Sequence, residues 1–211
     1  MNYNNNERYS RQTVIEEIGT KGQEKLKRSS ILIIGCGGLG SPAALYLASA
    51  GIGRIGLVDD DIVSISNLQR QILHGETDLG VPKTESAENS IKRINSDIII
   101  DKYQERLTED NAEEIFIEYD FIIDATDNFE SKFLINDVCV SMNKAFVHAG
   151  VMGFKGQVMT YVPGKGPCYR CIFGDIPNDE LLNRPEVFGI LGTVTGVIGS
   201  IEGTEAVKYL L

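Results

Sequence analysis

The sequence predicts an α/β fold in which a mostly parallel β-sheet carries helices on both faces, with an antiparallel C-terminal portion. Three observations support this prediction. Short apolar runs rich in β-branched residues alternate with longer segments of helical pattern. A group of glycines closes the first apolar run and leads into a helix. From Gly153 to Gly166 the chain changes to short polar and glycine-rich pieces.

The first strand and helix show the alternation most clearly. Ser30–Ile34 (SILII) is an apolar run, which is typical of a strand buried on both faces. We expect a helix over Ser41–Ala50, because Ser41 can cap its N-terminus, Pro42 suits its first turn and Gly51 can end it.

The remaining elements follow in the same order. We expect strands at Arg54–Asp59, Asp97–Lys102, Phe121–Ala125 and Ala145–Ala149, and helices at Lys83–Asn95, Glu109–Tyr119, Asn128–Met142 and Thr193–Leu211. Residues 153–166 are expected to form antiparallel strands or a loop region. Because no repeat, low-complexity segment or linker interrupts the 211 residues, we predict a single domain over residues 1–211.

The charge balance excludes some classes of partner. The chain has a net charge of −10, with 20 Lys and Arg against 30 Asp and Glu. Nucleic acids and anionic membranes are bound by clustered Lys and Arg, so we expect neither as a partner. No apolar run approaches the roughly 20 residues that span a bilayer. The polar N-terminus does not resemble a signal peptide, and we expect a cytoplasmic protein.

The glycines between the first strand and helix form the pattern G-x-G-x-x-G, typical of a Rossmann-like sheet. Gly35 allows a sharp turn, Gly37 lets the backbone approach a phosphate, and Gly40 lets helix and strand pack closely. Asp59 ends the next strand, where a carboxylate can accept hydrogen bonds from a ribose. These residues alone favour NAD or FAD over ATP.

Charged residues beyond this loop favour a different chemistry. Arg70, Lys83, Asp127 and Asn128 follow the predicted strands, and the loops after parallel strands bind ligands. A nucleotidyl transferase must neutralise a triphosphate with cations and a metal-binding carboxylate. Taken singly, each residue has an ordinary interpretation as a solvated charge or a helix cap. Their combination favours nucleotidyl transfer.

These motifs together resemble the ThiF/MoeB/HesA proteins, the bacterial and archaeal relatives of ubiquitin-activating enzymes. The matching segments are Arg8–Gln12 (RYSRQ), Gly35–Gly40, Asp59 with Asp61, Ser66–Gln71 (SNLQRQ), Lys83, Ala125–Phe129 (ATDNF) and Pro167–Cys171 (PCYRC). The match runs from about Glu7 to the end of the chain, and the order of several motifs makes it more specific than the glycine loop alone.

The resemblance implies an ATP-dependent adenylyltransferase that uses Mg2+. Such enzymes adenylate the terminal Gly-Gly carboxylate of a small ubiquitin-like β-grasp sulfur carrier, in molybdopterin, thiamine or thio-tRNA biosynthesis. The nucleotide-binding residues would be Gly35, Gly37, Gly38, Gly40, Asp59, Asn67, Arg70, Lys83, Asp127 and Asn128, with Asp127 also binding Mg2+. Arg70, Lys83 and Asp127 would act in catalysis, together with Arg11 reaching into the partner's site of a homodimer.

The chain departs from the family at its cysteines. Cys168 and Cys171 resemble half of the family's Zn2+ site, whose second C-x-x-C pair does not occur before Leu211. Cys36 and Cys139 fall in the glycine loop and a helix, so we expect neither as a ligand. A shortened piece, a naturally short protein and zinc ligands from elsewhere all remain open. We expect that the family's C-terminal segment is missing, and that both thiols are then free of metal.

A second departure concerns sulfur transfer. Many relatives carry a cysteine where this chain has residues 184–188, around Pro185. Since only a thiolate can form the thioester or persulfide link, we expect adenylation alone, with sulfur supplied by a separate protein such as a sulfurtransferase. His74 and His148 are the only histidines, and we expect a structural place for both.

Two other functions compete with this one. An NAD- or FAD-dependent oxidoreductase would explain the glycine loop, but not Arg70, Lys83 and Asp127. A non-catalytic relative that only docks a partner would explain the missing segment and the missing loop cysteine, but not the presence of every residue assigned to ATP and Mg2+.

Overall fold

A computed structural model describes residues 5–175 and 189–211 of the chain. Its centre is a six-stranded sheet in the order β3-β2-β1-β4-β5-β6. The strands are β1 Ser30–Ile34, β2 Arg54–Val58, β3 Ile99–Tyr103, β4 Phe121–Asp124, β5 Phe146–Met152 and β6 Lys155–Tyr161. The first five strands are parallel, and only β6 runs antiparallel, against β5. The predicted α/β sheet with an antiparallel C-terminal portion is confirmed.

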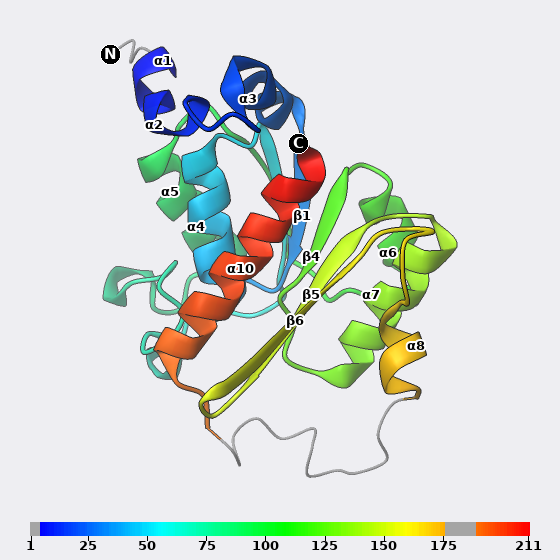
Figure 1. The fold of residues 1–211 in the computed structure, drawn as a ribbon. Coiled ribbons are helices and arrows are strands. Elements are labelled where there is room, and N and C mark those ends of the chain that lie inside the picture. The colour runs from blue at the N-terminus through cyan, green and yellow to red at the C-terminus, as the bar shows by residue number, and fades with distance from the viewer. Residues whose placement is uncertain (1–4, 176–188) are drawn as a thin grey trace.

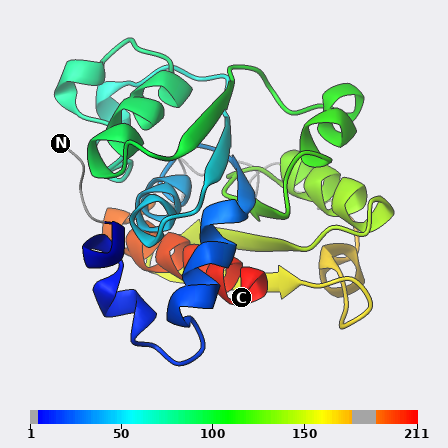
Figure 2. The ribbon, with the colours of Figure 1, turned by 90° about the horizontal axis from the view of Figure 1, so that it is seen from above.

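Helices cover both faces of this sheet. They are α1 Asn5–Arg8, α2 Ser10–Thr13, α3 Gly19–Arg28, α4 Gly40–Ala50, α5 Lys83–Ile94, α6 Glu109–Phe116, α7 Phe129–Ser141, α8 Tyr169–Phe173 and α10 Gly192–Leu210. One buried cluster joins the sheet to α3, α4, α5 and α10, and a second joins its other face to α6, α7 and α8. Figures 1 and 2 show α4 and α10 on one side of the strands and α6 and α7 on the other.

The predicted elements lie within a few residues of the observed ones. The segment after residue 152, left open between strand and loop, forms β6, and β5 extends three residues beyond its predicted end. Four helices, α1, α2, α3 and α8, were not predicted. The predicted N-cap at Ser41 is wrong, because Leu39 takes that position and the Ser41 hydroxyl donates to the Gly37 carbonyl oxygen.

Two glycines let the chain turn between β1 and α4. Gly35 has φ +98°, a left-handed conformation that favours glycine, and a Cβ there would lie 2.8 Å from the Ala125 carbonyl oxygen. A Cβ on Gly40 would collide with the Gly35 carbonyl oxygen. The first turn of α4 therefore packs directly on the loop that follows β1.

A carboxyl group is buried beneath α10. Glu202 is 0% exposed, and neither of its carboxyl oxygens has a partner among the described residues. Burial, together with the charge of Asp124, raises the pKa of Glu202 well above its ordinary value, against a smaller opposing effect of Lys132. Folding therefore favours the protonated form of this side chain.

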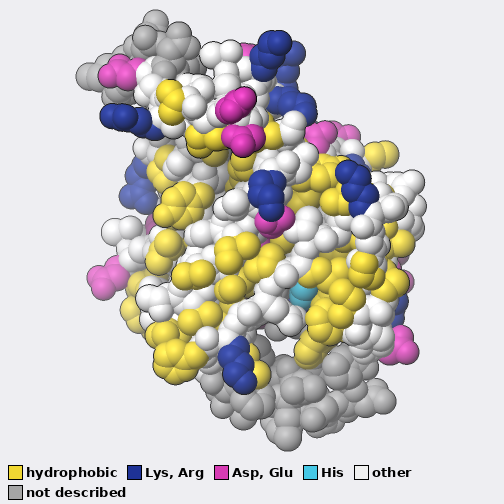
Figure 3. Space-filling model, viewed as in Figure 1, with side chains coloured by type: hydrophobic (Ala, Val, Ile, Leu, Met, Phe, Trp, Pro, Cys, Tyr) yellow, Lys and Arg dark blue, Asp and Glu magenta, His cyan; other side chains and the backbone are white. Residues whose placement is uncertain are grey.

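Apolar side chains gather on the outer face of α10 and on the β5–β6 hairpin (Figure 3). Val197, Ile201, Met152 and Phe154 are all exposed, Phe154 at 85%. A contiguous apolar surface of this kind suits contact with another protein. Within the described ranges, no helix is both long and apolar enough to cross a membrane.

Replacing Gly40 by alanine tests the contact between α4 and the glycine loop. We expect Gly40→Ala to destabilise the protein by about 1–3 kcal/mol, because the methyl group forces the loop and helix apart. Gly196→Ala on α10 is the matched control, since nothing lies within 4 Å of its Cβ position, and it should stabilise by about 0.5–1 kcal/mol. Urea unfolding measures both changes. Equal stability of the two variants would contradict the observed packing.

Glu202→Gln tests the buried carboxyl group. Since the folded pKa is raised, Glu202 contributes stability that is complete below the unfolded pKa of about 4.5 and is lost as the pH rises through the folded pKa. Glu202→Gln removes this loss, at about 1.4 kcal/mol for each unit between the two pKa values. Thermal unfolding from pH 4 to 8 should show the variant gaining on the native protein as the pH rises. Glu205→Gln on the same helix is the control, and a pH-independent difference for Glu202→Gln would refute the assignment.

Candidate active site

Three loops meet at the point of the sheet where the order of the strands reverses. β1 lies between β2 and β4, so the chain order reverses at β1, and ligands bind at such a point beyond the carboxyl ends of the strands. The loop Gly35–Leu39 follows β1, Asp59 follows β2, and Ala125–Asn128 follows β4. The Cys36 N–H donates to Asp59 Oδ2 at 2.7 Å, which joins the first two loops.

The glycine loop presents free backbone donors. The N–H groups of Gly37, Gly38 and Leu39 donate to no atom of the described residues. They lie at the N-terminus of α4, where the helix dipole is positive. Thr195 of α10 lies 3.1 Å from the position of a Cβ on Gly38, so the backbone is approached closely here. These three N–H groups, of Gly37, Gly38 and Leu39, form a cradle that fits a phosphate group.

Asp59 and Lys83 form a buried charged pair at the edge of this cradle. Asp59 accepts hydrogen bonds from the backbone N–H groups of Cys36 and Asp61. Lys83 Nζ lies 2.7 Å from Asp61 Oδ2 and 3.8 Å from Asp59 Oδ1, and its side chain is 7% exposed. Burial raises the pKa of Asp59, while Lys83 and the two hydrogen bonds oppose that rise. Both predicted residues thus lie beside the glycine loop.

Asn67 and Arg70 come from the segment between β2 and α5. Asn67 Oδ1 accepts a hydrogen bond from the Ser64 N–H, which closes a short turn, and Arg70 Nη1 donates to Ser66 O at 3.0 Å. The start of α10 packs against this segment, because a Cβ on Gly192 would touch Gln69 O and Arg70 Cα. Arg70 as a whole is half-buried.

Sequence reasoning gave no role to Gln71, the residue after Arg70. Gln71 is 5% exposed, and its Oε1 has no partner among the described residues. Its Nε2 lies 3.6 Å from the position of a Cβ on Gly37, so the amide faces the glycine loop. The only signal in the sequence was its place in the polar segment Ser66–Gln71.

The loop after β4 presents Asp127 to solvent. Asp127 is exposed, and its carboxylate makes no hydrogen bond or ion pair within residues 5–175 and 189–211. Asn128 caps α7, with Oδ1 accepting from the Ser131 N–H at 2.9 Å. A free carboxylate beside a cradle of N–H donors fits Mg2+, which prefers oxygen ligands and is shared with substrate phosphates. A contact between Asn128 and the nucleotide stays a prediction.

Arg11 lies far from its own chain's cradle. The neighbouring Gln12 donates to the carbonyl oxygen of Ala50, the last residue of α4, whereas the glycine loop adjoins the first residue. The 11 residues of α4 separate the two ends by about 16 Å. Arg11 is exposed and makes no ion pair with any residue that the structure describes. The structure therefore does not bring Arg11 to the other predicted site residues.

The two cysteines of the C-x-x-C pair lie together. Cys168 Sγ and Cys171 Sγ are 3.6 Å apart at the start of α8. Burial opposes ionisation of Cys168, but hydrogen bonds from Cys171, Arg170 and Asn136 together outweigh it and lower the pKa of the thiol. Within the described ranges, no group of three or more His, Cys, Asp or Glu could hold a metal ion. Residues 184–188, where relatives carry a cysteine, lie outside the described residues.

Both histidines are buried and hydrogen-bonded. His74 Nδ1 is 2.8 Å from Ser86 Oγ on α5 and Nε2 is 2.9 Å from Cys36 O, so the ring joins α5 to the glycine loop. Burial lowers the pKa of His74. His148 Nδ1 lies 2.8 Å from Asp124 Oδ2, and burial also lowers its pKa. Neutral, buried rings fit the structural place that we expected.

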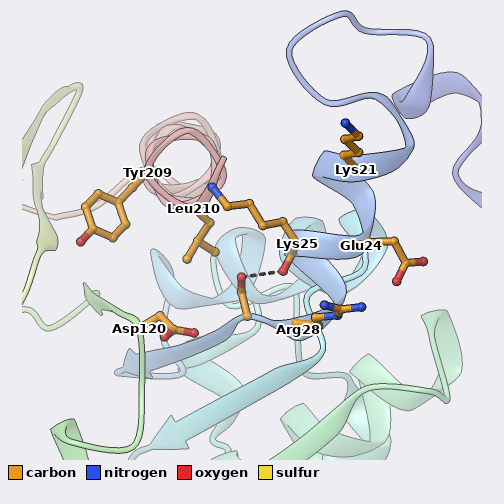
Figure 4. Close-up of a pocket in the computed structure, with 8 residues that line it drawn as sticks. Lys21, Glu24, Lys25, Arg28, Asp120, Tyr209 and Leu210 are labelled. Carbon is orange, nitrogen blue, oxygen red and sulfur yellow. Dashed lines mark hydrogen bonds between the residues drawn. The ribbon is translucent and has the colours of Figure 1, made fainter.

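An open cavity of about 550 Å³ lies at the other end of the sheet. Its lining includes Lys21, Lys25 and Arg28 of α3, Asp120, and Tyr209 and Leu210 at the end of α10 (Figure 4). Asp120 immediately precedes β4, so this cavity adjoins the amino ends of the strands. None of the predicted nucleotide-binding residues lines it.

Comparison with known proteins agrees with the geometry. The model of the ThiF family matches residues 9–211. The chain is 47% identical over 210 residues to "Adenylyltransferase and sulfurtransferase MOCS3" of Aedes aegypti, covering 99% of this chain and 48% of that protein. The corresponding protein of Arabidopsis thaliana is 45% identical over 95% of this chain and 43% of its own length. The chain thus spans about half the length of these curated relatives.

Solved structures give the same result for the fold. A crystal structure of E. coli MccB with ATP superposes with a TM-score of 0.84 at 29% identity, covering 98% of this chain and 64% of that one. MccB bound to MccA-N7isoASN also gives 0.84, at 28% identity over 99% of this chain and 65% of that one. Together with the arrangement of the glycine loop, Lys83 and Asp127, these matches show that the chain belongs to the ThiF family.

Proposed function

We propose that residues 1–211 form a single ATP-dependent adenylation domain that transfers AMP to the terminal carboxylate of a small protein. The observation that carries this proposal is the meeting of three N–H groups, two basic side chains and one carboxylate at the same edge of the sheet. The N–H groups and the carboxylate have no partner among the residues that the structure describes. A dehydrogenase has no use for this density of charge. A triphosphate requires it.

The described residues support a mechanism based on charge neutralisation and alignment. The N–H groups of the glycine loop bind phosphate oxygens, and Asp59 holds the ribose. Arg70 and Lys83 neutralise charge that develops on the phosphates. The attacking carboxylate is already ionised and needs no general base, so alignment supplies much of the rate. Mg2+ held by Asp127 would neutralise further phosphate charge.

The proposal extends to the protein that supplies the carboxylate and to the pathway that it serves. We propose a ubiquitin-like β-grasp sulfur carrier ending in Gly-Gly, serving molybdopterin, thiamine or thio-tRNA biosynthesis. The name of the MOCS3 relatives includes both adenylyl and sulfur transfer, which supports a sulfur carrier as the substrate. The apolar surface on α10 and the β5–β6 hairpin supports a protein as partner.

The zinc site and the source of sulfur differ here from the pattern of the family. The 3.6 Å separation of Cys168 Sγ and Cys171 Sγ suits two ligands of a tetrahedral Zn2+ ion with bonds of about 2.3 Å. Such a site needs two further ligands, and we propose that Zn2+ binds only where other residues supply them. We also propose that sulfur comes from a separate sulfurtransferase, since no cysteine occurs around Pro185.

ATP–pyrophosphate exchange tests the proposed reaction. The purified protein with Mg2+ should exchange label when supplied with one of the Gly-Gly-ended β-grasp proteins of the same genome. We expect Asp127→Ala to abolish this exchange with little change in thermal stability, because the side chain is exposed and unbonded. Asp110→Ala on α6 is the control and should keep full activity. Exchange retained in folded Asp127→Ala would refute the role of Asp127, and ATP binding without exchange would favour a docking module.

Mixing two inactive variants tests the homodimer and the role of Arg11. If Arg11 acts in the partner's site, Arg11→Ala and Asp127→Ala are each inactive alone. After subunit exchange, a mixed dimer holds one site with both residues intact, and an equal mixture should recover about one quarter of native exchange activity. The double variant, which carries both substitutions in one chain, should stay inactive when it is taken through the same subunit-exchange procedure. No recovery in the first mixture, with mixed dimers demonstrated by mass spectrometry, would place Arg11 outside the reaction.

A further inference from the structure

Two buried charges lie directly beneath the loop that carries Asp127. Asp124 is the last residue of β4 and is 0% exposed, and the side chain of Lys132, on the second turn of α7, is 7% exposed. Lys132 Nζ lies 3.5 Å from Asp124 Oδ1. Burying two charges is costly unless hydrogen bonds satisfy them, so their bonds show what the pair holds in place.

Most of these bonds go to one residue, Thr126. Its N–H and its hydroxyl both donate to Asp124 Oδ1, at 3.1 and 2.6 Å. Lys132 donates to the Thr126 carbonyl oxygen at 2.6 Å and to the Ala149 carbonyl oxygen of β5 at 2.8 Å. Both backbone polar groups of the residue before Asp127 are therefore bound to buried charges.

The other side of Asp127 and the far side of Asp124 are also held. Asn128 caps α7 through its hydrogen bond with the Ser131 N–H. His148 lies 2.8 Å from the second oxygen of Asp124 and keeps that carboxylate in place. Asp127 is thus an exposed side chain with no bond to any described residue, on a backbone that is fixed on both sides.

We infer that Asp124 and Lys132 are positioning residues that hold the Asp127 carboxylate where it can bind Mg2+ together with ATP. The inference rests on the proposed function, since it assigns Asp127 to the metal. Mg2+ demands near-ideal octahedral geometry, so a loosened loop should bind it more weakly. Removing a residue that orients a metal ligand typically costs 10–100-fold in metal affinity.

Lys132→Met tests this inference against a matched control. Lys144 also donates to two backbone carbonyl oxygens, those of Tyr119 at 2.6 Å and Ile117 at 3.3 Å, but near the amino ends of the strands. Thermal stabilisation of the full chain by ATP is measured as Mg2+ is titrated. We expect the Mg2+ midpoint to rise about 10-fold or more in Lys132→Met, to recover in Lys132→Arg, and to stay unchanged in Lys144→Met.

A milder variant and a metal-free measurement cover the case in which Lys132→Met does not fold. Thr126→Val removes one hydroxyl bond to Asp124 and keeps the charged pair, and it should raise the Mg2+ midpoint by a smaller factor. Amide hydrogen exchange of residues 125–128 in the free protein should be faster in Thr126→Val and Lys132→Met than in Lys144→Met.

The outcomes separate the two proposals. Unchanged Mg2+ midpoints in folded Lys132→Met and Thr126→Val, beside a normal response of the native protein, would overturn the positioning role alone. A native protein that ATP does not stabilise at any Mg2+ concentration would overturn the proposed function, and the assignment of Asp127 to Mg2+ with it.

Discussion

The fold depends on one close approach, that of the first turn of α4 to the loop after β1. Only glycine fits at Gly35 and Gly40, because a Cβ at either position would meet a carbonyl oxygen. This contact directs the N-terminus of α4 at the carboxyl edge of the sheet and leaves three N–H groups without partners among the described residues. The same backbone geometry therefore packs helix against strand and creates an anion site.

Basic side chains lie near this cradle although the protein as a whole is strongly acidic. The chain carries a net charge of −10, yet the buried Lys83 is held beside the glycine loop by Asp59 and Asp61. Arg70 directly precedes Gln71, whose amide faces that loop. A buried ammonium group is screened less by salt than an exposed one. Because Lys83 is already buried and held in place before a nucleotide binds, the nucleotide meets an oriented charge rather than a mobile side chain.

Buried polar groups at the end of β4 support the loop that carries Asp127. Lys132 and the hydrogen bonds from His148 and Thr126 outweigh burial and lower the pKa of Asp124 to about 2, so the carboxylate stays ionised. His148 is neutral, and Asp124 with Lys132 gives the cluster no net charge. Burial raises the pKa of Glu202 on α10, which favours its uncharged form. Buried titratable groups are thus kept uncharged or paired while Asp127 remains free at the surface.

The sequence predicts the alternation of strands and helices, the glycine loop and the charged residues beyond the strands. It can do so because period, glycine spacing and motif order are local properties. It did not predict α1, α2, α3, α8, the Leu39 cap or the buried place of Gln71. Those depend on which surfaces meet: α3 packs against the sheet and the end of α10, and α8 seats Tyr169 on His148. Two further facts are seen only in the folded chain: Arg11 lies at the far end of α4, and Asp124 and Lys132 meet beneath Asp127. Such contacts join residues far apart along the chain, and no local pattern records them.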